Sequence, residues 1–599
     1  MVLDIIYVTY NSQKWIQKCF ESVVQGNYPN NKLNIFVVDN ASEDETLVEL
    51  NRIKNGIGKQ FNKFEIIKSN ENLGFGKANN LGFSKGNSEV ACFFNIDTEV
   101  FTNTISNLVG EIQSSDEEVA LWELRQFPYE HPKFYNIITG YTTWSSGAAF
   151  AMKRVLYKEL NGFDEKIFMY AEDVDLSWRI RANGYKLKYC PKATITHYSY
   201  EGANEVKPNQ YLNSIINNLL LRYRFGNLKT ILKGNIMLLG LIRHKGPFEH
   251  SRKMLIKRYL KHFLSMPHFL SWKFNNKYID AKFQPKFLGW DYEIIRNGAF
   301  YKNEYPKTNP LVSIIVRTCN RPNVLRETLI SLRNQTYSNI EIVIVEDGKN
   351  TAEQMINEEF GDLNILYFAT NEKVGRSKAG NKAMELANGK YLNFLDDDDL
   401  FFAEHVEVLV KHLEGNKERV AYALAYETPI KVESNTPYVY EEVFHSLIYR
   451  QTFNRLVLFH HNYIPIQAIM FERELFFENS GLDESLDALE DWDLWVRYAL
   501  KDDFLFIDKV TSVYRVPFNR EISEERQKTL DNALHVVRKK HQNYEAINTP
   551  NRVAHELDEI LNTYSIKISA EVMAKLEERI PLAPKVINKI KQILKSRLK

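Results

Sequence analysis

The stretch that decides the fold is "YLNFLDDDDLFF" (391–402), in which an apolar run ends in four consecutive aspartates. A shorter version, "ACFFNIDTEVF" (91–101), occurs half a chain earlier. An acidic turn after a strand is one interpretation, but four adjacent carboxylates repel one another and gain nothing from folding alone. Because side chains alternate along an extended chain, Asp396 and Asp398 lie on the same side. Two such carboxylates suit a hard divalent cation that also binds a diphosphate.

Five motifs recur in the same order in the two halves of the chain. The pairs are "DIIYVTYNS" (4–12) with "VSIIVRTCNRP" (312–322), "NIFVVDNASED" (34–44) with "IEIVIVEDGKN" (340–350), "NENLGFGKANNLG" (70–82) with "NEKVGRSKAGNKA" (371–383), the two stretches above, and "YAEDVDLSWRI" (170–180) with "LEDWDLWVRYA" (489–499). Asp39 and Asp347 are 308 residues apart, and Gly74 and Gly375 are 301 residues apart. Ordered matches at similar offsets predict a tandem duplication.

Within each half, short Val/Ile/Phe-rich runs alternate with segments of helical periodicity, such as 12–24 and 324–334. Apolar strands separated by helices predict a mainly parallel sheet that is covered on both faces, which is the α/β class. Ligands bind such sheets at the carboxyl ends of the strands. Each motif begins where a strand ends, so we expect all five to meet at one edge of the sheet.

The expected organisation is two Rossmann-like domains joined by a helical segment and followed by a helical tail. The segment between the copies is basic and aromatic, and the chain becomes helical again near residue 521. The predicted boundaries are 1–205 for the first domain, 206–305 for the helical segment, 306–520 for the second domain and 521–599 for the C-terminal region.

Composition excludes several classes of protein. Lys+Arg 77 against Asp+Glu 76 leaves a net charge of +1, so no global basic field indicates nucleic acid as a partner. Four dispersed cysteines without a CxxC pair argue against a zinc ribbon and a disulfide framework, and fit a reducing compartment. The first residues, "MVLDIIYVTYNS" (1–12), resemble a strand more than a signal peptide. We therefore expect a cytoplasmic protein.

The chain ends in "KVINKIKQILKSRLK" (585–599), whose apolar residues fall on one helical face among six cations and no acid. A helix packed on the body of the protein would show this pattern, and so would a helix lying on a membrane surface. The basic charge favours the membrane, so we expect a peripheral contact with the cytoplasmic face of the inner membrane through this helix.

Acidic pairs in both halves are candidates for catalysis. Glu172–Asp173 and Glu490–Asp491 each open a helical pattern, where acids ordinarily act as caps stabilised by the helix dipole. Because both copies carry them at the same place, a carboxylate there can act as general base on an acceptor hydroxyl. Asp39 and Asp347 end the second strand of each copy, where they form a turn or accept a bond from a pyrimidine N–H or ribose hydroxyl.

The two copies differ in their metal-binding residues. The first has Asn95 and Asp97, a weaker set with one carboxylate, and His197 after a later strand as a further ligand or a structural side chain. The second has "SVYRVPF" (512–518) in the place of that histidine, with Pro517 where a ligand would lie.

At these motifs both halves resemble inverting family-2 glycosyltransferases of the GT-A fold, over about 1–205 and 310–520. The resemblance implies a nucleotide-sugar donor, most simply a UDP- or dTDP-sugar, a divalent metal (Mn²⁺ or Mg²⁺) and a single displacement with inversion. The first copy is similar to bacterial rhamnosyltransferases, and the second to a "DDDD…EDWD" branch of capsule and O-antigen synthesis.

The resemblance also implies a role for each matched residue. It assigns donor binding to Thr9, Asn11, Asp39, Gly74, Asn79, Trp144 and Glu172 in the first copy, and to Thr318, Asn320, Asp347, Lys378 and Glu490 in the second. It assigns metal binding to Asp97, His197, Asp396 and Asp398, and general-base catalysis to Asp173 and Asp491.

The function that we expect is addition of two sugars to a growing, lipid-linked bacterial surface glycan such as O-antigen, capsule or a cell-wall polymer. One alternative is a single active domain beside a copy that binds glycan or acts as a scaffold. A second is a nucleotidyltransferase, which shares strand-end acids but usually has a Gly-rich basic loop near its N-terminus. A purely structural protein leaves the paired acids unexplained.

Overall fold

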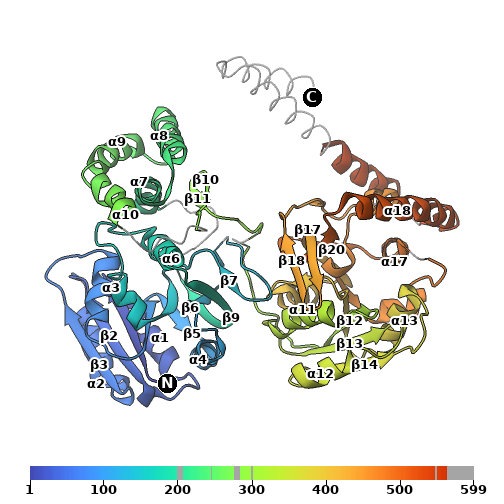
Figure 1. Ribbon diagram of the computed structural model, residues 1–599, viewed down its shortest axis with the longest axis horizontal. Helices are drawn as coiled ribbons and strands as arrows, with labels where there is room; N and C mark the ends of the chain where they lie inside the picture. Colours follow the sequence, from blue (N-terminus) through green and yellow to red (C-terminus); the bar gives the residue numbers. More distant parts are fainter. Residues whose placement is uncertain are drawn as a thin grey trace.

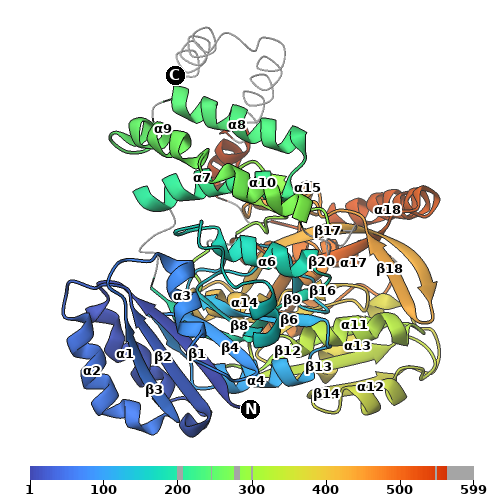
Figure 2. The ribbon, with the colours of Figure 1, turned by 60° about the vertical axis from the view of Figure 1, so that its left-hand side comes forward.

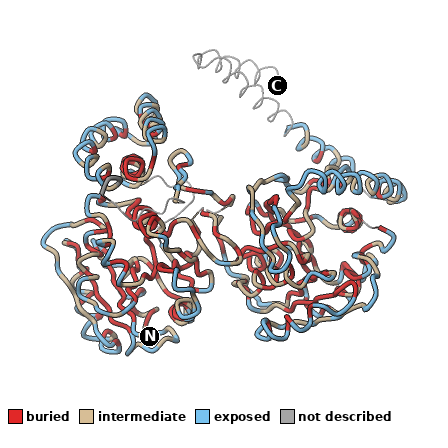
Figure 3. Tube along the Cα trace, in the orientation of Figure 1, coloured by how far each residue is buried: buried red, intermediate tan, exposed pale blue. Residues whose placement is uncertain are grey.

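The computed structural model describes residues 1–131, 133–198, 207–244, 246–275, 283–298, 301–486, 488–546 and 549–562. Two α/β domains lie side by side, each built around one mixed sheet (Figure 1). The strands of both sheets are mostly buried, as Figure 3 shows. The candidate C-terminal helix at 585–599 lies outside the described residues.

The first sheet has the strand order β3-β2-β1-β4-β8-β6-β9-β5, with β7 paired to β9. β1 to β4 run parallel and β8 runs antiparallel to both of its neighbours. Its strands are β1 (Leu3–Thr9), β2 (Leu33–Asp39), β3 (Lys63–Lys68), β4 (Val90–Asn95), β5 (Thr98–Val100), β6 (Val119–Phe127), β7 (Tyr141–Thr142), β8 (Ala149–Lys153) and β9 (Lys186–His197). The helices are α1 (Gln13–Val24), α2 (Thr46–Asn55), α3 (Phe75–Phe83), α4 (Thr104–Ser114), α5 (Arg154–Glu159) and α6 (Glu172–Ala182), with short 3-10 turns at Asn30–Lys32 and Ile57–Gln60.

The second sheet repeats this order as β14-β13-β12-β15-β19-β17-β20-β16, with β18 paired to β17. Its strands are β12 (Val312–Thr318), β13 (Ile340–Glu346), β14 (Ile365–Ala369), β15 (Tyr391–Phe394), β16 (Leu400–Phe401), β17 (Val420–Asn435), β18 (Tyr438–Glu442), β19 (Ile469–Glu472) and β20 (Phe504–Pro517). The helices are α11 (Pro322–Arg333), α12 (Glu353–Glu359), α13 (Arg376–Leu386), α14 (His405–Gly415), α15 (Arg455–His460), α16 (Glu474–Asn479), α17 (Glu490–Ala499) and α18 (Arg520–His541), with a 3-10 turn at Ile466–Ala468. The shared strand order confirms the expected tandem pair of GT-A domains.

Strand register corrects one of the predicted equivalences. Thr9 pairs with Asp39 in the first sheet, whereas Thr318 pairs with Glu346, not Asp347, in the second. The N–H of Asp347 donates to Thr318 O at 2.8 Å, the bond that Asn40 makes in the first domain. Asp347 is therefore the counterpart of Asn40. The sequence alignment was wrong by one residue because "VVDN" and "VEDG" each offer an aspartate near the strand end.

Between the two sheets the described residues form four helices and a short hairpin. They are α7 (Pro208–Phe225), α8 (Leu228–Arg243), α9 (Ser251–His262), α10 (Met266–Asn275), β10 (Phe287–Leu288) and β11 (Asp291–Tyr292). The Asn217 amide on α7 donates to the carbonyls of Met169 and Tyr170, just before α6. This helical module therefore packs against the edge of the first domain that carries the acidic pair. Across the described residues, no helix is both long and apolar enough to span a membrane.

A buried group of charged residues joins the two domains. Arg125 on β6 donates to Glu407 on α14 through two bonds of 2.8 and 3.0 Å, and to Glu130 at 2.8 Å. Arg296 bridges Glu130 and Glu404. The members of this interdomain ionic cluster, all at most 5% exposed, are Arg125, Glu130, Arg296, Glu404, Glu407 and Lys509.

Candidate active sites

The end of β1 and the loop after β2 form the first part of the first site. Thr9 is fully buried, and its hydroxyl donates to an Asp39 carboxylate oxygen at 3.3 Å. Asn11 has a left-handed backbone (φ 49°), as does Asn320 in the second domain (φ 54°). Asparagine tolerates this conformation better than most residues, so the Thr-x-Asn motif encodes the same sharp turn twice.

The glycine before the third helix of each domain has a backbone that other residues rarely adopt. Gly74 has φ 81° and Gly375 has φ 96°. A Cβ at Gly74 would lie 2.5 Å from Phe168 O, so the close approach of two loops also requires glycine there. Asn79 is buried and bonds back to Phe75 O in its own helix, whereas Lys378 is exposed on α13. Among these residues, which were predicted to bind the sugar donor, Asn79 thus uses its side-chain amide within its own helix.

Asp97 and His197 face each other at the edge of the first sheet, with Asp97 Oδ1 3.6 Å from His197 Nε2. His197 Nδ1 lies 2.8 Å from Gln126 Oε1, and an amide oxygen only accepts, so Nδ1 carries the proton. The buried Nε2 has no hydrogen-bond partner and faces the Asp97 carboxylate. Burial raises the pKa of Asp97, but His197 in its protonated form, a backbone N–H and Lys207 together hold that pKa below its usual value.

This arrangement fits a divalent cation. A neutral imidazole nitrogen beside a carboxylate oxygen can serve as a metal-ligand pair, and the hydrogen bond that His197 Nδ1–H donates to Gln126 sets the tautomer that binding needs. No group of three or more His, Cys, Asp or Glu side chains is arranged to hold a metal in the described part of the chain. A cation held by these two side chains would have its other coordination positions open to water and to diphosphate oxygens. Hard cations such as Mg²⁺ are commonly bound in this way.

Glu172 and Asp173 begin α6 after two residues, Tyr170 and Ala171, that both have left-handed backbones. Asp173 accepts from the N–H of Gly147 at 2.9 Å and from that of Val174 at 2.8 Å. Burial raises the pKa of both carboxyl groups, and the charge of Asp173 adds to the rise for Glu172. Two adjacent acids with raised pKa values at a strained turn are suited to proton transfer.

A buried lysine that the motifs did not indicate lies behind this pair. Lys133 forms an ion pair with Glu123 and donates to Trp144 O at 3.1 Å, with its ammonium 5.0 Å from the Trp144 ring centre. Its positive charge lowers the pKa of Asp173, against the effect of burial. Trp144, a predicted donor residue, is only 8% exposed. No sequence signal ties Lys133 to the site, because its loop is brought there by the packing of β7 on β9.

In the second domain a buried arginine from β12 lies beside the acidic groups. Arg317 donates to both carboxylate oxygens of Asp396, at 2.8 and 2.7 Å, and to Glu490 at 2.9 Å. It thus connects the aspartate run to the acidic pair that opens α17. The equivalent position of the first domain, Val8 on β1, has no charge.

The other three aspartates of the run are also held by protein groups. Asp397 accepts from Thr318 at 2.7 Å and from Arg321, and burial raises its pKa to about 7. Asp398, the most exposed of the four, accepts from Arg321 at 3.2 Å. Asp399 accepts from the backbone N–H of Arg515 at 3.1 Å. The structure leaves Asp396 and Asp398 a poorer fit to a metal than the pair in the first domain.

The second domain also differs at the position of His197. Glu99 pairs with Thr196 in the first sheet, and Leu400 pairs with Val513 in the second. Glu99 and Leu400 lie at the same place in the two copies, so their partners Thr196 and Val513 are equivalent. His197 follows Thr196 and Tyr514 follows Val513, so Tyr514 and not Pro517 is the counterpart of the histidine. The sequence comparison missed this because the two strands share no residue pattern beyond a threonine.

Asp491 is the counterpart of Asp173 on α17. Its carboxylate accepts from the Asn462 amide at 2.9 Å, and Leu489 before it has a left-handed backbone (φ 60°). Burial, with the charge of Glu490, raises the pKa of Asp491 to about 7. Asn462 is a site residue that no motif indicated.

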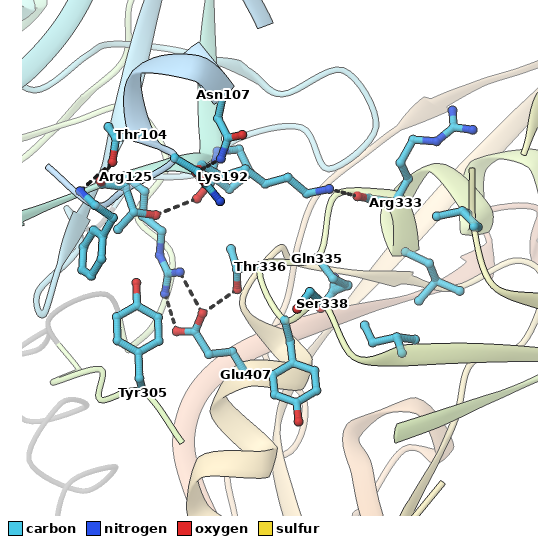
Figure 4. A pocket seen from close by; sticks show the side chains of 18 of the residues that line it. Thr104, Asn107, Arg125, Lys192, Tyr305, Arg333, Gln335, Thr336, Ser338 and Glu407 are labelled. Carbon is cyan, nitrogen blue, oxygen red and sulfur yellow. Dashed lines mark hydrogen bonds and ion pairs between the residues drawn. The ribbon is translucent and has the colours of Figure 1, made fainter. Parts of the chain in front are cut away.

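A cavity between the two domains lies away from both sites (Figure 4). It has a volume of about 670 Å³ and lies between α4 of the first domain and the start of β13 in the second. Several of its polar side chains bond to one another or to backbone, for example Thr336 to Glu407 and Lys192 to Arg333 O. None of the predicted site residues lines this cavity.

Comparison with known proteins supplies the family. A model described as glycosyl transferase family 2 matches residues 4–176 and 313–476, together more than half of the chain. An uncharacterized glycosyltransferase of Methanocaldococcus jannaschii is 28% identical over 217 residues, covering 35% of this chain and 72% of that protein. An uncharacterized glycosyltransferase of Rickettsia bellii is 32% identical over 210 residues, which is 34% of this chain and 28% of that protein.

Two further similarities extend this comparison. The putative colanic acid biosynthesis glycosyl transferase WcaA of Escherichia coli is 27% identical over 198 residues, covering 33% of this chain and 68% of that protein. Among solved structures, a mannosyltransferase from Pyrobaculum calidifontis in complex with GDP-Man and Mn²⁺ is 19% identical with a TM-score of 0.31, covering 45% of this chain and 72% of that one.

Proposed function

Because this chain belongs to glycosyl transferase family 2 through both of its halves, we propose that it is a bifunctional inverting glycosyltransferase. It transfers sugars from nucleotide-diphosphate sugars to a growing bacterial surface glycan on a lipid carrier. The observation that carries the proposal is the repeated acidic pair: Glu172–Asp173 and Glu490–Asp491 open equivalent helices after equivalent left-handed turns. The relative named for colanic acid biosynthesis supports a surface glycan as product.

The proposed mechanism uses one aspartate in each domain as general base. Asp173 or Asp491 takes the proton of the acceptor hydroxyl while that oxygen attacks the anomeric carbon of the donor. The bond between this carbon and the diphosphate oxygen breaks from the opposite side, so the configuration inverts. A base with a pKa raised toward neutrality matches this task, because it accepts a proton readily and still loses it between turnovers.

A divalent cation, when bound, neutralises the diphosphate leaving group. In the first domain Asp97 and His197 would hold it, with Gln126 fixing the imidazole. The backbone turns around Thr9 and Asn11, and around Thr318 and Asn320, would hold the nucleosides. In the second domain no step is assigned to a metal, since both oxygens of Asp396 bond to Arg317.

One alternative has support in the structure. The ion pairs of Arg317 with Asp396 and Glu490 make the second site unlike the first. Such a difference is expected if one copy only binds glycan. Family membership favours sugar transfer over nucleotidyl transfer in both halves. The domain boundaries at 205, 305 and 520, and attachment to the inner membrane, stay part of the proposal.

Donor hydrolysis tests the proposal without an acceptor. The purified chain and its Asp173→Asn and Asp491→Asn variants would be incubated with UDP-, dTDP- and GDP-sugars and Mn²⁺ or Mg²⁺. Two donors should be consumed, and each variant should lose a different one by roughly 10²- to 10⁴-fold. Consumption of one donor, with one variant behaving as wild type, would show that a single domain is active.

Titration of Mn²⁺ in the presence of UDP tests the metal sites by binding alone. His197→Ala should abolish the tighter site, and Gln126→Leu should weaken it by about 10- to 100-fold, because the imidazole loses its fixed orientation. Asp398→Asn serves as the comparison in the second domain. Unchanged Mn²⁺ affinity in His197→Ala would contradict the assignment.

A further inference from the structure

The outer face of α8 carries large apolar side chains that no described residue covers. Leu228, Leu232, Ile236 and Leu239 are between 54% and 71% exposed. Their spacing of four, four and three residues puts them on one face of a helix of 16 residues, about 24 Å long. The opposite face is already used, since Leu238 is fully buried in a cluster with α7 residues. A surface helix would ordinarily be polar on the side that α8 leaves apolar.

The neighbouring helix α9 continues this surface. Leu260 at its end and Leu264 just after it are 64% and 82% exposed. In both views α8 and α9 lie on the far side of α7 from the first sheet (Figures 1 and 2). We call the exposed apolar residues of this region the α8–α9 face: Leu228, Leu232, Ile236, Leu239, Leu260 and Leu264.

The segment that carries these apolar residues is rich in positive charge. Between residues 228 and 264 the only acidic residue is Glu249. The basic residues in that span are Lys229, Lys233, Arg243, Lys245, Arg252, Lys253, Lys257, Arg258 and Lys261. Apolar side chains flanked by lysine and arginine are typical of helices that lie in the plane of a membrane surface and attract anionic lipids. We propose that the α8–α9 face binds the surface of a membrane that contains anionic lipid.

Charge argues against a second copy of this chain as the occupant. Symmetric pairing through this face would bring the same lysines and arginines together, and like charges across an interface oppose association. An anionic bilayer instead supplies both an apolar layer for the leucines and phosphate groups for the cations.

The position of the face also suits the proposed acceptor. α7, on which α8 and α9 pack, bonds through Asn217 to the backbone just before Glu172. A membrane bound at this face therefore lies on the side of the module that adjoins the first site. Only this link to a lipid-linked acceptor rests on the proposed function; the binding surface itself does not.

Flotation of the full-length chain with lipid vesicles tests the proposal. Wild-type protein should float with vesicles of phosphatidylcholine and phosphatidylglycerol, and less with phosphatidylcholine alone or at high salt. The variant L232S/I236S/L239S should bind at least about tenfold less, because three apolar side chains no longer enter the lipid. The matched control is V48S/V155S, which alters two equally exposed apolar residues of the first domain and should bind as wild type.

Tryptophan fluorescence provides a second test that does not depend on correct folding of the triple variant. Ile236→Trp should shift its emission to the blue and be quenched by brominated lipids on vesicles, whereas Val155→Trp should do neither. Full vesicle binding by L232S/I236S/L239S would overturn the proposal and assign binding to another part of the chain, such as the basic C-terminus. Dimers in sedimentation that this variant dissociates, without vesicle binding, would overturn it in favour of a second copy. Sugar donors are absent from these assays, so failure here leaves the donor-hydrolysis result unaffected.

Discussion

Buried cations distinguish the two sites at the scale of single residues. Lys133 lies in a loop beside the first site, and Arg317 lies near the carboxyl end of the apolar strand β12 beside the second site. Both lie close to acidic groups that the motifs predicted. Arg317 is 79 residues from Asp396 in sequence, and only the pairing of β12 with β15 brings them together. Arg317 can be buried at low cost because two carboxylates, those of Asp396 and Glu490, accept its hydrogen bonds.

The pH dependence of the second domain follows from Asp491. With a pKa of about 7, it is deprotonated and able to act as base only above that pH. The second-domain kcat/KM should therefore rise with pH through about 7. Asn462→Ala removes a donor to the carboxylate, so the pKa should rise further and the acid limb should move up by about one unit or less. Measurement of kcat/KM against pH checks both statements.

The control for this profile is Asn416→Ala, which alters an exposed asparagine at the end of α14. It should leave the limb in place. An acid limb unmoved by Asn462→Ala, or one lying near pH 4 in wild type, would show that Asp491 is not the titrating base.

At the scale of elements, α6 and α17 each begin with three acids that have different roles. The first two form the acidic pair, and the third anchors the next helical segment. Asp175 accepts from Arg179 and Arg224, the latter on α7. Asp493 accepts from Arg497 and from Lys540 of α18. The Glu-Asp-x-Asp motif thus combines a site with the attachment of the helices that follow each domain.

Substitution by asparagine should consequently lower the stability at Asp175 but the transfer activity at Asp173. Asp175→Asn removes the charge that two buried arginines share, so the first domain should lose about 3–5 kcal/mol of stability. Asp173→Asn should leave the stability close to wild type while abolishing first-domain transfer. Urea unfolding followed by circular dichroism measures the first quantity. Equal stability of the two variants would refute the anchoring role of Asp175.

For the whole molecule, the interdomain ionic cluster connects the two sheets. Arg125 contacts Glu130 of its own domain and Glu407 of the other with almost no exposure to water. Charges so deeply buried stabilise the contact only while every partner is present. The cluster therefore makes the relative position of the domains sensitive to a single residue.

Substitution of Arg125 should loosen this contact. Arg125→Met leaves Glu407 buried without its bidentate partner, at a cost of about 3–5 kcal/mol. Thermal unfolding should change from one transition toward two, and small-angle scattering should report a larger radius of gyration. Arg52→Met, which breaks an exposed pair with Glu49, is the control and should change neither. A compact Arg125→Met protein with a wild-type melting curve would contradict the role of the cluster.

The sequence predicted the features that repeat locally. The alternation of apolar strands and helices, the two-fold order of motifs and the paired acids were enough for two GT-A domains, since such patterns arise within a few residues of chain. Register was harder: Asp347 and Pro517 were matched to the wrong residues, because a shift of one or a few positions leaves a short motif looking the same.

By itself, then, the sequence determined the fold class, the duplication and the family, because these depend on periodicity and on motifs that are contiguous in the chain. Only the tertiary structure decided which charges meet: Lys133 with Glu123, Arg317 with Asp396, His197 with Gln126, and Arg125 with Glu407. It also decided that, among the described residues, none covers the outer side of α8. The physical reason is that hydrogen bonds and ion pairs act over a few ångströms between residues far apart in the chain, and no local pattern encodes that distance.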